Sequence, residues 1–252
     1  MNNKENRGNW YSQSRFDVRL EWGLSGAENL AQEVDCVVVI DVMSFSTCVS
    51  MANDNNALIY PYIFKDETAI KYAQTLGADV ANFTRKFDTG EFSLSPQSLQ
   101  AIPTDYRLVL PSPNGSTISF MARDSGAAVF SGCFRNLMAT AKACIGFKHI
   151  LIIPSGERWM DGSLRPAVED YVAAGGIITF LGDRNLSPEA QAAAAAFACY
   201  KKDNFLSLNY CSSATELKER GFETDIALCL EYNVSSNANR LNADFYKSVP
   251  VV

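Results

Sequence analysis

The stretch CVVVIDVMSFSTC, residues 36–48, decides the fold. Its first part, Cys36–Ile40, is a continuous and mostly β-branched apolar run. Such a run is typical of a strand buried on both faces, as in a parallel sheet covered by helices. Ligands of such sheets bind just beyond the carboxyl ends of the strands, so Asp41 stands where chemistry is commonly done. Asp41 can equally cap the following helix, and this stretch alone leaves both interpretations open.

Two further segments repeat this layout of a strand, a polar turn and a helix. The apolar runs RLVL and AAVF lead into the turns PSPNGST (111–117) and SGCFRN (131–136). Asn114, Gly115 and Ser116 can present N–H groups and a hydroxyl to an anion at a helix start, although Asn-Gly more often marks a simple turn. Three such strand ends favour an α/β fold with a functional edge.

The densest polar stretch is SGERWMDGSLRP, residues 155–166, which follows a strand predicted at residues 149–153. Pro166 suits the first position of a helix, whose body then includes Glu169 and Asp170. These two neighbours point about 100° apart on a helix, so only one can aim squarely at a site. The pair can also serve only to complement the helix dipole.

Other segments carry clear structural signals and no chemistry. Asp66 and Gly77 bound one predicted helix, and an Ala-rich helix is predicted from Ser187 to about Lys202. Ser213 with Glu216 predicts a capping box for a short helix. Residues 82–104 lack periodicity and read as a surface loop or an irregular connection. Residues 249–252 read as a short terminal strand or tail.

The composition is that of an ordinary soluble globular protein, with 47% hydrophobic and 20% charged residues. We expect a flexible terminus at residues 1–13 and an α/β domain at residues 14–252, possible as one body or as two closely packed lobes. A net charge of -6 without a Lys/Arg cluster weighs against a nucleic-acid partner. Without a membrane-length apolar run or a signal-peptide core, we expect a cytoplasmic protein with no membrane partner.

Several chemistries are excluded by what the chain lacks. The seven cysteines are scattered without a CxxC pair, which argues against a disulfide framework and a zinc site. A single histidine rules out His-based triads and multi-His metal sites. No GxxxxGK[ST] or GxGxxG motif occurs. Metal-assisted hydrolysis with carboxylates and anion binding without catalysis remain.

Five segments together resemble the 2-phosphosulfolactate phosphatase (ComB-like) family. They are VVVIDVMSFST, PSPNGST, SGCFRN, GERWMDGSLRPAVED and SSATELKERGFETD, in family order from about residue 16 onward. The resemblance implies a three-layer α/β/α fold with a largely parallel or mixed sheet. It also implies a Mg²⁺-dependent acid phosphatase, which in methanogens acts in coenzyme M synthesis.

The resemblance also implies roles for single residues. Asp41 matches the family's acidic residue at a strand end, and Asn114 and Gly115 match its Asn-Gly turn. Gly156 matches the glycine after a later strand, and Glu169 with Asp170 matches a Glu-Asp pair. One position departs from the pattern, because Ser44 stands where the family has an arginine. Loss of one charge-assisted contact weakens anion binding about ten- to a hundred-fold. Either Arg135, Arg158 or Arg165 takes over the role, or the substrate has changed, or catalysis has been lost.

The first hypothesis is therefore a phosphoric monoester hydrolase that uses Mg²⁺ to act on a small phosphorylated acidic metabolite. Asp41 would hold the metal with Asp170 or, alternatively, Glu169. The predicted catalytic residues are Asp41, Glu169 and Asp170, and the predicted substrate-binding residues are Ser44, Ser46, Thr47, Asn114, Gly115, Ser116, Gly156, Glu157, Arg158 and Arg165. The second hypothesis is a non-catalytic family member that binds an anionic metabolite. The sequence does not determine the oligomeric state, and a homodimer stays open.

Overall fold

The computed structural model describes residues 9–88 and 90–251, and these residues build a mixed sheet of nine strands. The strands are β1 Val18–Leu20, β2 Cys36–Ile40, β3 Leu58–Tyr62, β4 Asp79–Val80, β5 Arg107–Pro111, β6 Ala128–Gly132, β7 Ile150–Pro154, β10 Asn237–Asn242 and β11 Phe245–Pro250. Their order is β1-β7-β2-β6-β10-β11-β3-β5-β4. The pairs within β1-β7-β2-β6 and within β3-β5-β4 are parallel, and the antiparallel hairpin β10–β11 joins the two groups.

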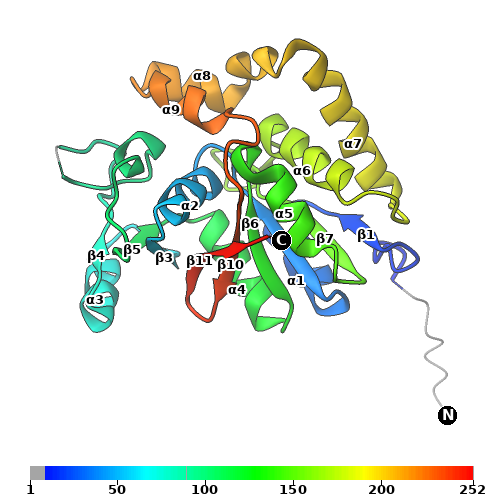
Figure 1. The fold of residues 1–252 in the computed structure, drawn as a ribbon, viewed down its shortest axis with the longest axis horizontal. Helices are drawn as coiled ribbons and strands as arrows, with labels where there is room; N and C mark the ends of the chain where they lie inside the picture. The colour runs from blue at the N-terminus through cyan, green and yellow to red at the C-terminus, as the bar shows by residue number, and fades with distance from the viewer. Residues whose placement is uncertain (1–8, 89, 252) are drawn as a thin grey trace.

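Helices cover both faces of this sheet (Figure 1). The helices of the described residues are α1 Gly23–Leu30, α2 Phe45–Asp54, α3 Glu67–Leu76, α4 Gly115–Asp124, α5 Leu137–Cys144, α6 Val168–Phe180, α7 Pro188–Tyr200, α8 Ser212–Glu219 and α9 Glu223–Cys229. A separate two-stranded ribbon consists of β8 Glu157–Arg158 and β9 Leu164–Arg165. The predicted three-layer α/β/α fold with a mixed sheet is confirmed.

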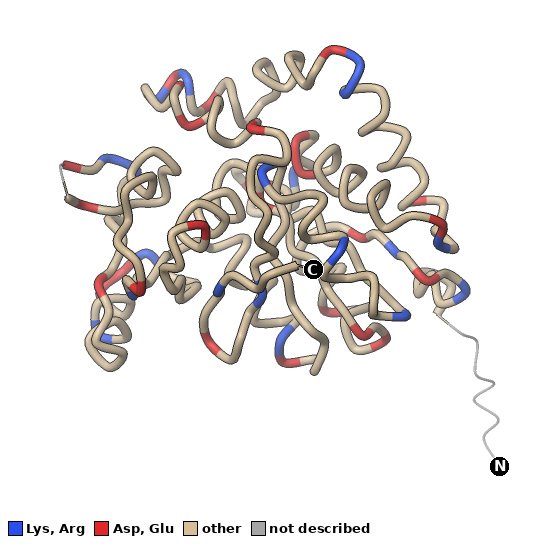
Figure 2. The backbone as a smooth tube through the Cα atoms, viewed as in Figure 1, with Lys and Arg blue, Asp and Glu red and all other residues tan. Residues whose placement is uncertain are grey.

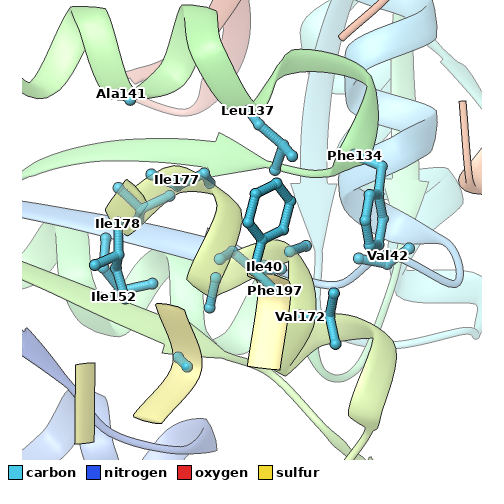
Figure 3. Close-up of a cluster of buried hydrophobic side chains, with 14 of the residues drawn as sticks. Ile40, Val42, Phe134, Leu137, Ala141, Ile152, Val172, Ile177, Ile178 and Phe197 are labelled. Carbon is cyan, nitrogen blue, oxygen red and sulfur yellow. The ribbon is translucent and has the colours of Figure 1, made fainter. Parts of the chain in front are cut away.

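The central strand β2 shows why three layers form. Successive side chains of a strand point to opposite faces, and all five residues of β2 are fully buried. Val38 and Ile40 pack into a core with α5, α6 and α7 (Figure 3), whereas Val37 and Val39 pack into a second core with α1, α2 and α4. Burial of each such side chain stabilises the folded state by about 1.5 to 3 kcal/mol. The fold is therefore most stable when helices cover both faces of β2.

The carboxyl-terminal hairpin is the main element that differs from expectation. The sequence predicted only a short strand or tail at 249–252, of which Val252 lies outside the described residues. The structure instead inserts β10 and β11 into the middle of the sheet, between β6 and β3. Tyr246 anchors the hairpin, because it is fully buried and its hydroxyl hydrogen-bonds Ser119 Oγ at 2.7 Å. The polar β10 sequence, NANRLN, gave little sign of a central strand.

Helix starts were predicted with mixed success. Asp66 caps α3 by accepting from Thr68 N at 2.9 Å, and Ser187 caps α7 by accepting from Ala190 N at 3.2 Å, as predicted. The capping box at Ser213 is wrong, because α8 begins at Ser212 and has no side-chain cap. Pro166 lies two residues before α6 rather than at its first position.

The chain surface carries both signs of charge. Figure 2 shows blue and red segments interspersed along the tube. Within residues 9–88 and 90–251, no helix has the length and apolar character that a bilayer crossing requires. Of the stretch predicted to be flexible, residues 1–8 lie outside the described residues, while Gln13 Nε2 donates to Leu20 O of β1 at 2.8 Å.

Candidate functional site

Asp41 lies directly after β2 and combines both roles that the sequence left open. Its Oδ1 accepts a hydrogen bond from Phe45 N, the first residue of α2, at 3.1 Å. The carboxylate also lines a cavity of about 380 Å³. Gly115, at the start of α4, approaches closely: a Cβ there would lie 2.3 Å from the Phe45 ring and 3.0 Å from Asp41 Oδ2. Only glycine therefore lets α4 pack against this carboxylate.

The cavity joins segments that are far apart in the chain. It is lined by Asp41, Met43, Ser44, Lys65, Arg85, Leu94, Ser112, Pro113, Asn114, Glu157, Arg158, Ser213, Glu216, Leu217 and Arg220. Five of these, Asp41, Ser44, Asn114, Glu157 and Arg158, belong to the predicted site residues. The turn after β2, the turn after β5 and the ribbon strand β8 therefore meet at one place, as the strand-end argument expected.

Asn114 connects an acid to a base at the cavity. Its Nδ2 donates to Glu157 Oε2 at 3.1 Å, and its Oδ1 accepts from Arg158 Nε at 3.3 Å. All three residues also line an adjoining cavity of about 240 Å³. One amide side chain thus orients a carboxylate and a guanidinium at the boundary between two cavities.

Asp170 braces the site from behind. It is 3% exposed and lies in the first turn of α6. Its Oδ1 accepts from Val42 N at 2.8 Å, and its Oδ2 accepts from Gly156 N at 2.9 Å. Each carboxylate oxygen thus fixes one strand-end turn, after β2 and after β7. Its neighbour Glu169 is also buried, at 2% exposure, and neither residue lines the cavity.

Asp41, Glu157, Glu169 and Asp170 form what we call the carboxylate cluster. Burial, followed by the charges of Glu169 and Asp41, raises the pKa of Asp170 well above its usual range. Burial raises the pKa of Asp41 to about 6, against hydrogen bonds from Phe45 and Gly115 that lower it. Burial and then the charge of Asp41 raise the pKa of Glu157 to about 7. The cluster therefore concentrates mutually repelling acids, which a cation would stabilise.

Of the four hydroxyl residues predicted to bind the substrate, Ser44, Ser46, Thr47 and Ser116, two bond the backbone of the turn after β2. Ser46 Oγ accepts from Asp41 N at 3.0 Å, and Thr47 Oγ1 donates to Val42 O at 2.8 Å, both fully buried. Ser116 is also fully buried, and its hydroxyl has no hydrogen-bond partner among the described residues. Only Ser44 of these four lines the cavity, where its Oγ accepts from Arg85.

The arginines that could replace the family's arginine are placed differently. Arg135 is ion-paired with Asp54 at 3.2 Å and with Glu231, and it does not line the cavity. Arg165 reaches Ser213 Oγ at 3.4 Å, and Ser213 is a cavity residue. Arg158 itself lines the cavity. Of these candidates, Arg158 is the best placed.

Three cations that sequence reasoning missed also line the cavity. Lys65, Arg85 and Arg220, here called the cationic cluster, come from the β3–α3 turn, the irregular segment 82–95 and the residue after α8. Lys65 and Arg85 lie in none of the five segments that carry the family resemblance, and Arg220 lies in the last of them without having been singled out. The helices α8 and α9 lie together above α2 in Figure 1, and α8 contributes Ser213, Glu216 and Leu217 to the cavity.

The donor set bears on the implied Mg²⁺. Within residues 9–88 and 90–251, no group of three or more His, Cys, Asp or Glu side chains is arranged to hold a metal. Mg²⁺ in phosphoryl-transfer sites usually keeps several waters and takes only one or two protein carboxylates. Asp41 and Glu157 both face the cavity, and their repulsion favours a bound cation. The residues present fit Mg²⁺ on these terms.

Comparison with known proteins points the same way. The family model described as 2-phosphosulpholactate phosphatase matches residues 25–243. A relative from Pseudothermotoga lettingae, described as "Probable 2-phosphosulfolactate phosphatase", is 25% identical over 228 residues, which cover 89% of this chain and 92% of the relative. The matched region contains the cavity and both charge clusters. The chain therefore belongs to the 2-phosphosulfolactate phosphatase family.

Proposed function

We propose that this protein is a phosphatase that hydrolyses a small acidic phosphoester similar to 2-phosphosulfolactate, with Mg²⁺ as its cofactor. The observation that carries the proposal is the cavity in which Asp41 and Glu157 meet Arg158 and three further cations. A phosphoester substrate needs such a pairing, because its charge must be neutralised while a metal is held nearby.

Asp41 and Glu157 would hold the ion, which supplies Lewis-acid polarisation of the phosphoryl oxygens when bound. Asp170 and Glu169 act behind them. Asp170 keeps the turns after β2 and β7 in register through its bonds to Val42 N and Gly156 N, and so orients Asp41. Asp170 was predicted as a metal ligand, and the engagement of both its oxygens favours this orienting role instead.

Arg158 would neutralise the phosphoryl group, held in place by Asn114 and by its own bond to Gly162 O at 3.0 Å. The hydrolysis breaks the P–O bond to the substrate's alcohol, forms a P–O bond to water and returns a proton to the alcohol. Burial of the carboxylates excludes bulk water from behind the reacting group and strengthens each charge interaction.

The test is an assay of the purified protein against a panel of phosphoesters that includes 2-phosphosulfolactate. Phosphate release is measured with Mg²⁺, with a chelator, and in the Asp41→Ala variant. We expect release that requires Mg²⁺ and disappears in the variant. The exposed Asp124 at the end of α4 supplies a matched control, because Asp124→Ala removes a carboxylate outside the cavity.

A different outcome would support the alternative function. If no substrate is turned over but the panel raises the melting temperature, the protein is a binding member of the family. Ligand stabilisation without turnover follows from mass action alone. Metal-independent phosphate release that persists in Asp41→Ala would contradict both the cofactor and the role of Asp41.

A further inference from the structure

Arg85 is the most deeply buried member of the cationic cluster. Its side chain is 9% exposed, whereas that of Arg220 is 51% exposed. It reaches the cavity from the irregular segment 82–95, and its Nη1 donates to Ser44 Oγ at 2.9 Å. The guanidinium therefore stands over the turn that carries Asp41. Its charge lowers the pKa of Asp41, against the larger effect of burial.

Asp225 of α9 holds Arg85 in this position. The two side chains form an ion pair at 3.2 Å, and Asp225 is 1% exposed. Its other oxygen, Oδ1, accepts from Ser95 Oγ at 2.6 Å and from Gln97 N at 3.2 Å. Asp225 thus connects α9 to Arg85 and to Ser95, which lie near the two ends of the irregular segment 82–95.

Phe222, immediately before α9, adds a second constraint. The guanidinium of Arg85 lies 5.7 Å from the centre of its ring, and that of Arg220 lies 5.8 Å from it. Guanidinium groups at this range are attracted to an aromatic ring. One ring and one carboxylate therefore hold two arginines near each other at the cavity, against their mutual repulsion.

The hydrogen bonds of Arg85 leave part of the guanidinium available. A guanidinium has five N–H donors, and both side-chain bonds recorded for Arg85 among the described residues come from Nη1. Burying a charge is costly unless it is paired, and among the described residues Asp225 supplies that pairing for Arg85 through Nη1. Burial and then the charges of Arg85 and Arg220 lower the pKa of Lys65, so the three cations repel one another even though Asp225 pairs with Arg85 and Glu216 with Arg220.

We propose that Arg85 is an anion-binding residue of this cavity, and that Asp225 and Phe222 are positioning residues that present its guanidinium beside Ser44. The proposal builds on the proposed phosphatase function, for which it supplies a determinant of substrate binding. The anion is either the phosphoryl group or a second acid group of the same substrate. Both have the oxygen geometry that a guanidinium binds as a fork.

The first measurement is of binding, and turnover is measured afterwards. Isothermal titration calorimetry uses 2-phosphoglycolate, which carries both a phosphoryl and a carboxylate group, with Mg²⁺ and again with a chelator. We expect Arg85→Ala to weaken binding about ten- to a hundred-fold. Arg123→Ala is the matched control, because Arg123 pairs with Asp124 and Asp244 outside the cavity and its loss should leave binding unchanged.

Because Arg85→Ala leaves Asp225 buried without its partner, a second variant guards against misfolding. The double variant Arg85→Ala/Asp225→Asn removes both charges together, and we expect the same weakening with a native circular dichroism spectrum. Asp225→Asn alone should raise KM several-fold with little change in kcat, and Arg85→Lys should recover part of the affinity. Binding by the double variant within twofold of wild type would overturn the proposal.

Two further probes identify the anion. If Arg85 binds the phosphoryl group, the double variant also binds inorganic phosphate more weakly than wild type does. If Arg85 binds the second acid group, the double variant binds glycolate more weakly than wild type does, and its affinity for inorganic phosphate is unchanged. The two proposals can fail separately. Binding that depends on Arg85 but occurs without turnover would contradict only the proposed phosphatase activity. Turnover with an unaltered KM in the double variant would contradict only the role of Arg85.

Discussion

The carboxylate cluster and the cationic cluster meet at the same cavity but are built in different ways. Asp41 and Glu157 of the first cluster line this cavity, as do all three cations of the second. Three of the four carboxylates follow strand ends or open a helix within segments that the sequence marks as special, and backbone N–H groups hold Asp41 and Asp170. The cations are single residues from a turn, an irregular segment and a helix end, and Asp225 and Phe222 hold one of them from elsewhere in the chain. The difference suggests that the chemistry depends on the carboxylates, whereas substrate preference depends on the cations.

The largest effect is expected when Asp41 is neutralised, and this change tests whether the chemistry depends on the carboxylate cluster. Asp41→Asn keeps the shape of the side chain but removes the charge that would hold Mg²⁺, so we expect kcat to fall at least about 10²- to 10³-fold. Steady-state phosphate release gives the measurement, and circular dichroism checks the fold. Activity within tenfold of wild type would remove Asp41 from the centre of the site.

Substitution of Asp170 tests whether the carboxylate cluster depends on the hydrogen bonds that this residue accepts from the backbone. Asp170→Ala removes two charge-assisted hydrogen bonds, to Val42 N and Gly156 N, and leaves both amides buried. We expect the free energy of unfolding to fall by about 3 kcal/mol, measured by denaturant titration. Asp170→Asn should lose less, because one oxygen remains. Unchanged stability together with lost Mg²⁺ binding would favour the original assignment of Asp170 as a metal ligand.

Ser44 is the point where the two clusters meet. The family resemblance leads us to expect an arginine at this position, but here Arg85 already lies beside it. Ser44→Arg should therefore crowd two guanidiniums at a residue that is 2% exposed, and lower stability by about 1 to 3 kcal/mol. Thermal melts and activity assays measure the effect. A gain of activity with Arg85 still present would show that the two arginines do not compete.

The pH dependence of stability reports on the repulsion within the carboxylate cluster. The pKa of Asp41 is raised to about 6 and that of Glu157 to about 7. The folded protein then binds these protons more tightly than the unfolded chain, so stability falls as pH rises through this range. In chelator, we expect the melting temperature to drop by a few degrees from pH 5 to pH 8.

Two comparisons isolate this effect. Glu157→Gln should flatten the fall in melting temperature, while Glu28→Gln, on the exposed side of α1, should leave it unaltered. Mg²⁺ added at pH 8 should raise the melting temperature of wild type more than that of Glu157→Gln. A melting temperature that rises with pH in chelator would show that the cluster does not carry mutual repulsion.

The smallest effect is expected at the exposed edge of the cationic cluster. Arg220 is about half exposed and already pairs with Glu216 at 2.9 Å, one helical turn earlier. Exposed pairs of this kind contribute about 0.2 to 1 kcal/mol, so Arg220→Ala should change KM by at most about fivefold. KM measured at low and high salt checks this. A loss as large as that of Arg85→Ala would erase the distinction between buried and exposed cations.

Sequence reasoning succeeded where local pattern and tertiary role coincide. The apolar run before Asp41 is buried on both sheet faces, as its composition required, and the turns at Asp41 and Asn114 meet at one cavity. It did not anticipate the contacts of Ser46 and Thr47, whose hydroxyls were predicted to bind the substrate and which bond the backbone of their own turn in the structure. Hydroxyls serve both purposes equally well, so residue type alone could not separate them.

By itself, the sequence determined the layered α/β fold and the carboxylates at the strand ends, because hydrophobic periodicity and strand-end polarity are local properties. Only the tertiary structure decided which cations join those carboxylates. The carboxyl-terminal hairpin enters the sheet centre, and α9 brings Asp225 against Arg85, 140 residues away in the chain. Such a contact depends on how distant segments pack, and no short pattern around Arg85 or Asp225 encodes it.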